Sequence, residues 1–190
     1  GAVADEICAA MSTVDEVRKI YVNDGGDIAF HLATGEILAV GLVPVLLNAQ
    51  LDGSVEISSD MNVRGIATSG MDGRSFSFGI VDAVTVLAAS AASADAAATL
   101  IANAVDADHP AIERAPASSL DPDSDLGDRL VTVNRGELPL ETIDAALSQG
   151  EAFARDLIER RLIDAAFLSC VGHIRIAGNN YTRTIETFLS

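Results

Sequence analysis

A tight glycine turn between two short apolar runs is the feature that most restricts how this chain folds. Ile20–Val22 is followed by the sequence NDGGD over Asn23–Asp27, and an apolar run resumes over Ile28–Leu32. Adjacent glycines adopt the positive φ values that a hairpin turn needs, so the segment predicts two antiparallel strands. Because an isolated hairpin is only marginally stable, the rest of the chain must supply further strands and a covering layer.

Short apolar segments predict further strands along the chain, and segments with helical periodicity separate some of them. The strands are expected at Glu36–Val43, Ser54–Ser58 after an acidic turn around Asp52-Gly53, the start of Arg64–Gly79, Asp82–Ala88, Arg129–Asn134, Ala165–Cys170 and His173–Ala177. The helices are expected at Gly1–Val17, Ser93–Val105 and Leu138–Leu162, and a long loop at His109–Asp128. No regular βαβ rhythm is present, so we predict one α+β domain over residues 1–190, with a largely antiparallel mixed sheet and flanking helices.

The predicted helices carry three further expectations. Ser93 is expected to cap the second helix, and Gly150 to split or weaken the third. The first helix begins without a capping residue, which suggests that an N-terminal portion is missing from this chain. Its apolar face then needs a partner, either an N-terminal fragment of the same precursor or a second copy in a homo-oligomer. That face consists of Val3, Ile7, Ala10, Met11 and Val14.

The charge of the chain restricts its partners. The formal net charge is −16 and aromatic residues make up 4% of the sequence, with no Trp. Such a chain repels phosphate backbones and offers few rings for base stacking, so nucleic acid is not expected as a partner. No apolar run is long enough to span a bilayer, and no signal segment is present, so no membrane partner and a cytoplasmic location are expected. Cys8 and Cys170 lack metal-binding spacing and are expected to be buried thiols.

Two loops are candidates for ligand binding. In the first, Gly25 and Gly26 would let backbone amides approach a ligand, with Asn23 and Asp27 beside them, although a plain hairpin turn explains the same residues. The second is the end of the strand that follows Arg64. It carries hydroxyls and free N–H groups that suit a phosphate, with Arg64 or Arg74 for charge, but an ordinary polar loop also fits. Its residues are Thr68, Ser69 and Gly70.

A candidate metal site lies on the second predicted helix. Asp95 and Thr99 are four residues apart, so their oxygens share one face of the helix. A carboxylate with a hydroxyl suits Mg²⁺, whereas the alternative is a capping aspartate and a threonine bonded to its own backbone. The aspartates of Asp121–Asp128 lack the glycine and glutamate positions of a calcium loop and predict a solvated acidic loop. The three histidines are far apart and single out no general base.

Four motifs, taken in order, resemble the ApbE superfamily of magnesium-dependent flavin transferases, and the similarity is greatest to an uncharacterised branch of it. They cover about half of the chain. The motifs are VNDGGDI at Val22–Ile28, GIATSG at Gly65–Gly70, DAVTVLA at Asp82–Ala88 and ADAAATLIANAV at Ala94–Val105.

The resemblance implies an ApbE-like fold with T-fold-like layering and chemistry on FAD, which these transferases split at its pyrophosphate to attach FMN to a protein. It also implies that Asp95 and Thr99 bind Mg²⁺, and that Gly25–Asp27 and Thr68–Ser69 lie beside the flavin. Transferases carry a histidine after the Thr-Ser-Gly segment, whereas this chain has Phe76 in that region. Two alternatives therefore stay open: a flavin-binding module without catalysis, and an enzyme acting on another small heterocyclic substrate.

Overall fold

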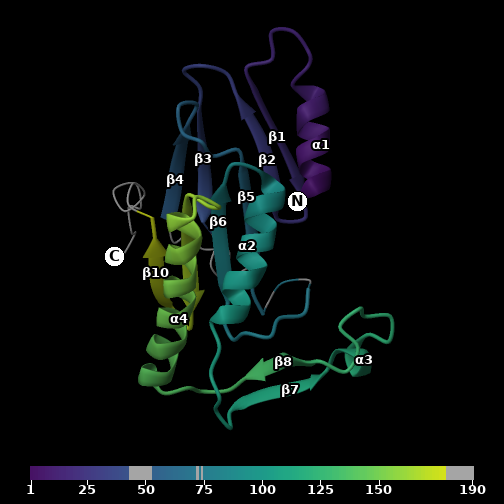
Figure 1. Ribbon diagram of the computed structural model, residues 1–190, viewed down its shortest axis with the longest axis vertical. Coiled ribbons are helices and arrows are strands. Elements are labelled where there is room, and N and C mark those ends of the chain that lie inside the picture. Colours follow the sequence, from purple (N-terminus) through teal and green to yellow (C-terminus); the bar gives the residue numbers. More distant parts are fainter. Residues whose placement is uncertain (43–52, 72, 74, 179–190) are drawn as a thin grey trace.

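The computed structural model describes residues 1–42, 53–71, 73 and 75–178. Its centre is an antiparallel sheet with the strand order β1-β2-β5-β6-β9-β10 (Figure 1). With helices on this sheet, the predicted α+β class and the antiparallel pairing are confirmed. The strands are β1 (Lys19–Asp24), β2 (Asp27–Leu32), β5 (Gly65–Ser69), β6 (Ala83–Ala88), β9 (Ala165–Cys170) and β10 (His173–Ala177).

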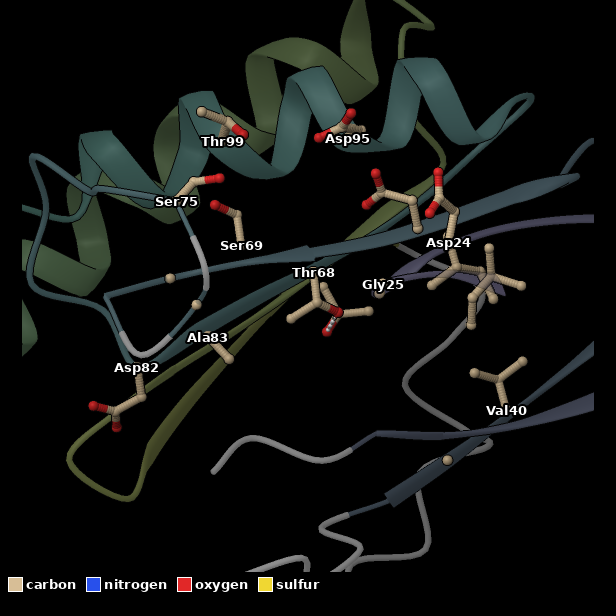
Figure 2. Close-up of a pocket in the computed structure, with 18 residues that line it drawn as sticks. Asp24, Gly25, Val40, Thr68, Ser69, Ser75, Asp82, Ala83, Asp95 and Thr99 are labelled. Carbon is tan, nitrogen blue, oxygen red and sulfur yellow. Dashed lines mark hydrogen bonds between the residues drawn. The ribbon is translucent and has the colours of Figure 1, made fainter. Parts of the chain in front are cut away.

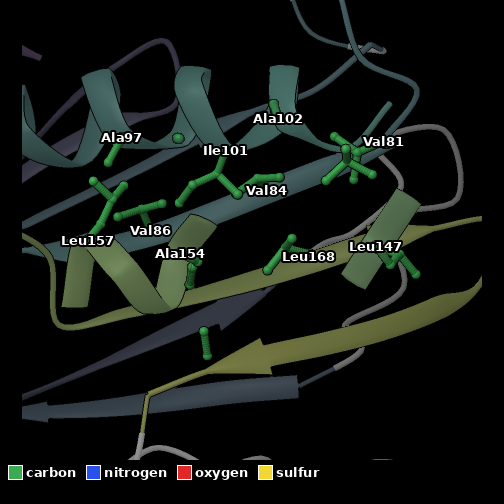
Figure 3. Close-up of a cluster of buried hydrophobic side chains, with 14 of the residues drawn as sticks. Val81, Val84, Val86, Ala97, Ile101, Ala102, Leu147, Ala154, Leu157 and Leu168 are labelled. Carbon is green, nitrogen blue, oxygen red and sulfur yellow. The ribbon is translucent and has the colours of Figure 1, made fainter. Parts of the chain in front are cut away.

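Three helices accompany the sheet: α1 (Ala2–Met11), α2 (Ala91–Ala104) and α4 (Leu140–Glu159). The larger core lies where α2 and α4 pack on β6 and β9 (Figure 3), and it is built of alanines and branched aliphatic residues. The prediction that Gly150 splits the third helix is wrong, because α4 is continuous. A Cβ at Gly150 would lie 2.3 Å from Cγ2 of Val105, so the glycine lets α4 pack closely against the end of α2.

A second layer lies on another part of the sheet. The strands β3 (Ile37–Leu42) and β4 (Gly53–Ser58) pair antiparallel with each other. Val55 and Ile57 of β4 are fully buried in a cluster with Phe30 of β2 and Phe167 of β9. Both predicted strands are thus present. The acidic turn expected at Asp52-Gly53 lies largely outside the described residues, since Asp52 is not described and Gly53 begins β4.

An extended arm projects from the lower end of the molecule in Figure 1. It consists of β7 (Ile112–Pro116), the short helix α3 (Ala117–Leu120) and β8 (Leu130–Arg135). The prediction of one long loop from His109 to Asp128 is therefore wrong for its first half. A strand at this place needs a partner, and its partner β8 lies on the far side of the intervening acidic segment. The local sequence of β7 does not indicate this pairing. The four aspartates of the loop are exposed, as expected for a solvated segment.

The first helix is shorter than predicted, since it ends at Met11 and not at Val17. The hydroxyls of Ser12 and Thr13 donate hydrogen bonds back to carbonyl oxygens of the last turn, and Glu16 has a positive φ of 70°. Short polar side chains that bond to the backbone compete with helix continuation, which explains the early end.

The capping residue of α2 also differs from the prediction. Ser90, and not Ser93, is the N-cap, because the Ser90 side chain accepts a hydrogen bond from the Ser93 amide at 3.1 Å. The next two amides, those of Ala91 and Ala92, donate to the Asp5 carboxylate, each at 2.9 Å. Asp5 therefore caps α2 from another helix and joins α1 to it.

Both cysteines are buried and neither forms a disulfide, in agreement with the sequence. Cys8 faces the sheet from α1, and Cys170 ends β9. Among the described residues, no helix has both the length and the apolar character needed to cross a membrane.

Candidate functional site

A pocket of about 500 Å³ opens between the β1–β2 turn, the ends of β5 and β6, and α2 (Figure 2). It brings together eight of the nine residues that the sequence singled out for binding a flavin or metal. Those that line the pocket are Gly25, Gly26, Asp27, Thr68, Ser69, Gly70, Asp95 and Thr99. Asn23 is the exception, as it lies just outside the lining.

The β1–β2 turn forms one wall of the pocket. Gly25 and Gly26 have φ values of 70° and 120°, which explains why both positions are glycine. The Gly26 amide donates to Oδ1 of Asn23 at 3.1 Å, so Asn23 shapes the turn without reaching the pocket. Asp27 follows the turn at the start of β2, and 23% of its side chain is exposed.

The floor of the pocket comes from β5 and β6. Thr68 and Thr85 lie opposite each other on the two strands, and their hydroxyls share a hydrogen bond of 2.8 Å. Ser69 follows at the end of β5 and is partly exposed. A Cβ at Gly70 would lie 2.1 Å from the Asp82 carbonyl oxygen, so a glycine is needed for β5 to leave the sheet this close to β6.

The opposite wall is α2, from which Asp95 and Thr99 face β5 in Figure 2. The helix lies close to the sheet because Gly65 has no side chain: a Cβ there would lie 2.0 Å from the Ala91 nitrogen. Asp95 is half-exposed and Thr99 is exposed, so the Asp95 carboxylate and the Thr99 hydroxyl are both accessible to a ligand.

Two carboxylates from different elements converge on one nitrogen at the pocket. The amino nitrogen of Gly1 donates to Oδ2 of Asp27 at 2.8 Å and to Oδ2 of Asp95 at 3.1 Å. The hydrogen bond to Asp27, aided by Asp95 and opposed by desolvation, raises the pKa of this amino group above its ordinary value. The space between the two carboxylates therefore stabilises a positive charge.

Sequence reasoning missed Asp82 and its partner. Asp82 lies at the pocket edge with only 6% of its side chain exposed, and Nη2 of Arg135 donates to Oδ1 at 2.6 Å. The second oxygen accepts from the Val171 amide, also at 2.6 Å. Arg135 also donates to the carbonyl oxygen of Ile80. No sequence signal links these residues, because they come from β8, the residue before β6 and the β9–β10 turn.

The charge of the lining is one-sided. Asp24, Asp27, Asp82 and Asp95 line the pocket, and no Lys or Arg does so among the described lining residues. Since Arg135 neutralises Asp82, the other three carboxylates remain to attract a cation.

Several candidates from the sequence lie elsewhere. Arg64, considered for phosphate binding, instead donates to the backbone carbonyls of Ser59, Met61 and Val63 and so holds the preceding turn. Arg74 lies outside the described residues. Phe76 is 37% exposed and does not line the pocket.

Two kinds of site are not found in the described part of the chain. No histidine lies in the described lining of the pocket. No group of three or more His, Cys, Asp or Glu side chains is arranged to hold a metal there either. A metal at this pocket would thus take only a few protein oxygens and complete its coordination with water or ligand oxygens, as Mg²⁺ commonly does.

Fold and site together define an α+β protein with an acidic, hydroxyl-lined pocket at the ends of its central strands. Residues 1–176 match the protein family described as AbpE bacteria, so the chain belongs to that family. A UPF0280 protein of Methanocaldococcus jannaschii is 33% identical over 105 residues, which are 55% of this chain and 41% of that protein. A UPF0280 protein of Methanothermobacter thermautotrophicus is 42% identical over 88 residues, which are 45% of this chain and 33% of that protein.

The chain thus spans between a third and about two fifths of the length of the curated relatives it matches. Neither relative's name states an activity. The expected similarity to an uncharacterised family agrees with these names, whereas the relation to flavin transferases belongs to the proposal that follows.

Proposed function

We propose that the pocket binds a flavin nucleotide together with Mg²⁺ and acts on its pyrophosphate, in the manner of the ApbE flavin transferases. The observation that carries this proposal is the convergence of the Asp27 and Asp95 carboxylates, from β2 and α2, on a single point at the pocket, where the Gly1 nitrogen lies 2.8 and 3.1 Å from them. A point between two carboxylates from different elements is the kind of position that a metal ion takes. An acidic protein needs such a cation to hold an anionic nucleotide.

The donor set suits Mg²⁺ chemically. Asp95 offers a carboxylate and Thr99 a hydroxyl from the same side of α2, and Asp27 faces them from β2. All three are hard oxygen ligands, and their small number leaves coordination positions for water and phosphate oxygens. When bound, Mg²⁺ neutralises the charge that develops on a pyrophosphate as it is split.

The remaining pocket residues would bind the nucleotide itself. Thr68 and Ser69 present hydroxyls at the floor, where they can donate to phosphate oxygens. The absence of side chains at Gly25 and Gly26 lets a flat ring approach the backbone of the β1–β2 turn. The fixed pair of Asp82 and Arg135 holds the far edge of the pocket in place.

A second candidate function is flavin binding without turnover. Transfer of FMN to a hydroxyl needs a base to take the proton, and none of the described lining residues is a histidine. This observation favours a module that holds a flavin nucleotide. The two candidates share the same ligand and differ only in whether the ligand is split.

The test is calorimetric titration of FAD and FMN into the 190-residue chain, with and without Mg²⁺. We expect FAD to bind only with Mg²⁺, and Asp95→Asn to weaken that binding at least about tenfold, the loss typical even of groups that merely support a metal ligand. Asp125→Asn is the matched control, because it makes the same charge change in the exposed acidic loop outside the pocket.

The outcomes separate the candidates. Release of FMN from bound FAD, measured by chromatography, supports the enzyme, whereas stable binding without release supports the binding module. Equal FAD affinity with and without Mg²⁺, or in the Asp95→Asn variant, contradicts the metal site. No flavin binding under any condition would contradict both candidates and favour another heterocyclic ligand on the same scaffold.

A further inference from the structure

The strand β1 leaves one side of its backbone without a partner in the described structure. It is the first strand of the sheet order, and β2 is its only hydrogen-bonded neighbour among the described residues. An edge strand of this kind is a template for pairing with another strand.

The register of the hairpin shows which groups face outward. The Ala33 amide donates to the Arg18 carbonyl oxygen at 2.8 Å, so Arg18 belongs to the set of residues that bond toward β2. Antiparallel pairs alternate, so Ile20, Val22 and Asp24 belong to the same set. The backbone groups of Lys19, Tyr21 and Asn23 then point away from β2, and 66% of Tyr21 is exposed.

An exposed apolar stripe on α1 lies beside the same edge. Asp5 reaches toward α2, and helical geometry places Val3, Ile7 and Ala10 on the opposite side of α1. Val3 is 59% and Ile7 45% exposed, which agrees with the expected unpartnered face. An apolar hollow lies between the end of α1 and the strand, and its lining includes Met11, Val14, Ile20 and Tyr21.

We propose that this edge binds a second copy of the chain, with β1 pairing antiparallel to β1 of that copy about a two-fold axis at Tyr21. Tyr21 then faces Tyr21 of the second copy as a hydrogen-bonded pair, and Ile20 faces Val22. Arg18 faces Asp24 twice, once on each side of the axis. In this pairing the Arg18 guanidinium faces a carboxylate, and the apolar side chains beside the axis face each other.

The neighbouring registers are less complementary. A two-fold axis at Val22 would place Ile20 opposite Asp24, an apolar side chain against a carboxylate. An axis at Ile20 would place Arg18 opposite Val22 and leave Asp24 beyond the pairing. A two-fold axis between two residues would place a residue whose backbone N–H and C=O point away from β2 opposite one whose groups already bond to β2. Antiparallel pairing does not allow this arrangement.

The proposed pairing also changes the pocket. Asp24 lines it, and the Arg18 guanidinium of the second copy would lie opposite Asp24 at its rim. Within its own chain Arg18 pairs with Glu36, with Nη2 and Oε1 2.6 Å apart, but its side chain is 67% exposed and has further donors for a second carboxylate. The second copy would therefore supply the positive charge that the described lining lacks.

Light scattering coupled to size-exclusion chromatography tests the proposal on the 190-residue chain. We expect the mass of two chains, and a shift to the mass of one chain for Tyr21→Glu, because the axis would bring two added carboxylates together. Tyr21 is exposed, so this variant should keep the circular dichroism of the parent. Leu140→Glu is the control, since Leu140 is 59% exposed on α4 at the other end of the sheet and should leave the dimer intact (Figure 1).

Two further measurements test the register. Arg18→Asp and Asp24→Arg should each raise the dimer dissociation constant about tenfold, and the double variant should restore it. Tyr21→Cys should form a disulfide-linked dimer on oxidation, since a hydrogen-bonded pair has Cα atoms about 5.5 Å apart, within the range of disulfides. Leu140→Cys should not. A monomeric parent chain, or a dimer that persists in Tyr21→Glu without crosslinking through Tyr21→Cys, overturns the proposal, and neither result depends on flavin or Mg²⁺.

Discussion

The two ends of the central sheet differ in how completely their groups are paired. At the β6–β9 end, α2 and α4 cover the strands with a dense core of small and branched residues. The Asp82 carboxylate is buried there, and its two oxygens accept hydrogen bonds from Arg135 and from the Val171 amide. At the β1 end, α1 buries only Ala4 and Cys8, while its apolar stripe is exposed. Beside α1, the carboxylates of Asp27 from β2 and Asp95 from α2 converge on the Gly1 nitrogen.

The difference indicates that one end of the sheet mainly stabilises the fold and the other mainly binds partners. A region whose polar and apolar groups are all satisfied contributes stability, and it has little left to offer a ligand. A region with converging carboxylates and exposed apolar side chains can bind partners, but it is locally less stable. Stability should therefore respond to changes at the β6–β9 end, and ligand binding and association to changes at the β1 end.

The largest expected loss of stability comes from Arg135→Met. This change leaves the Asp82 carboxylate buried with the Val171 amide as its remaining bonded partner, and unpaired buried charges cost about 3–5 kcal/mol of unfolding free energy. Urea unfolding followed by circular dichroism measures the loss.

The pair itself is isolated by two further variants. Adding Asp82→Asn to Arg135→Met should recover part of the loss, because the carboxylate charge is then gone. Arg160→Met removes an exposed partner of Asp156 on α4 and should change the free energy by less than about 1 kcal/mol. Equal losses for Arg135→Met and Arg160→Met would show that the buried pair does not distinguish the β6–β9 end.

A smaller loss is expected from Asp5→Ala, at the contact between the two ends. The change leaves the amides of Ala91 and Ala92 without their carboxylate acceptor, which costs about 1–2 kcal/mol. Asp5→Asn keeps one acceptor oxygen and should lose less. Glu6→Ala, at the exposed next position of α1, is the control for lost charge. A loss as large as that of Arg135→Met would mean that α1 is as integral to the fold as the covered core.

Much of this arrangement could be predicted from the sequence, because local signals determine it. The NDGGD turn, the apolar runs and the alanine-rich helix predicted the hairpin, β6 and α2. That residues of separate motifs meet at one pocket was implied by the resemblance to the ApbE superfamily and not by any local signal. The misses are contacts between distant segments. Asp82 with Arg135, Asp5 with α2, and β7 with β8 have partners that no local pattern identifies. Gly150 was misread because close packing with Val105, and not helix propensity, explains that glycine.

The two cysteines test the comparison without any substitution. Cys8 belongs to α1 and Cys170 to β9, and both are buried. Burial raises the pKa of both thiols, that of Cys170 to about 11, so both are protonated near neutral pH in the folded chain. For Cys170, the stabilising contribution of the neutral thiol is present below the ordinary pKa of 9.0 and is lost as the pH rises through about 11.

Alkylation near pH 8 should therefore report on opening of the structure and not on thiolate at the surface. We expect Cys8 to react faster, through local opening of α1, with a rate that depends weakly on urea. Cys170 should react only through global unfolding, with the full urea dependence of the equilibrium transition. Mass spectrometry of the labelled peptides gives both rates in one sample. Equal rates with equal urea dependence would show that the two ends open as one unit, so the exposed groups of the β1 end would then be part of a fold that is uniformly stable.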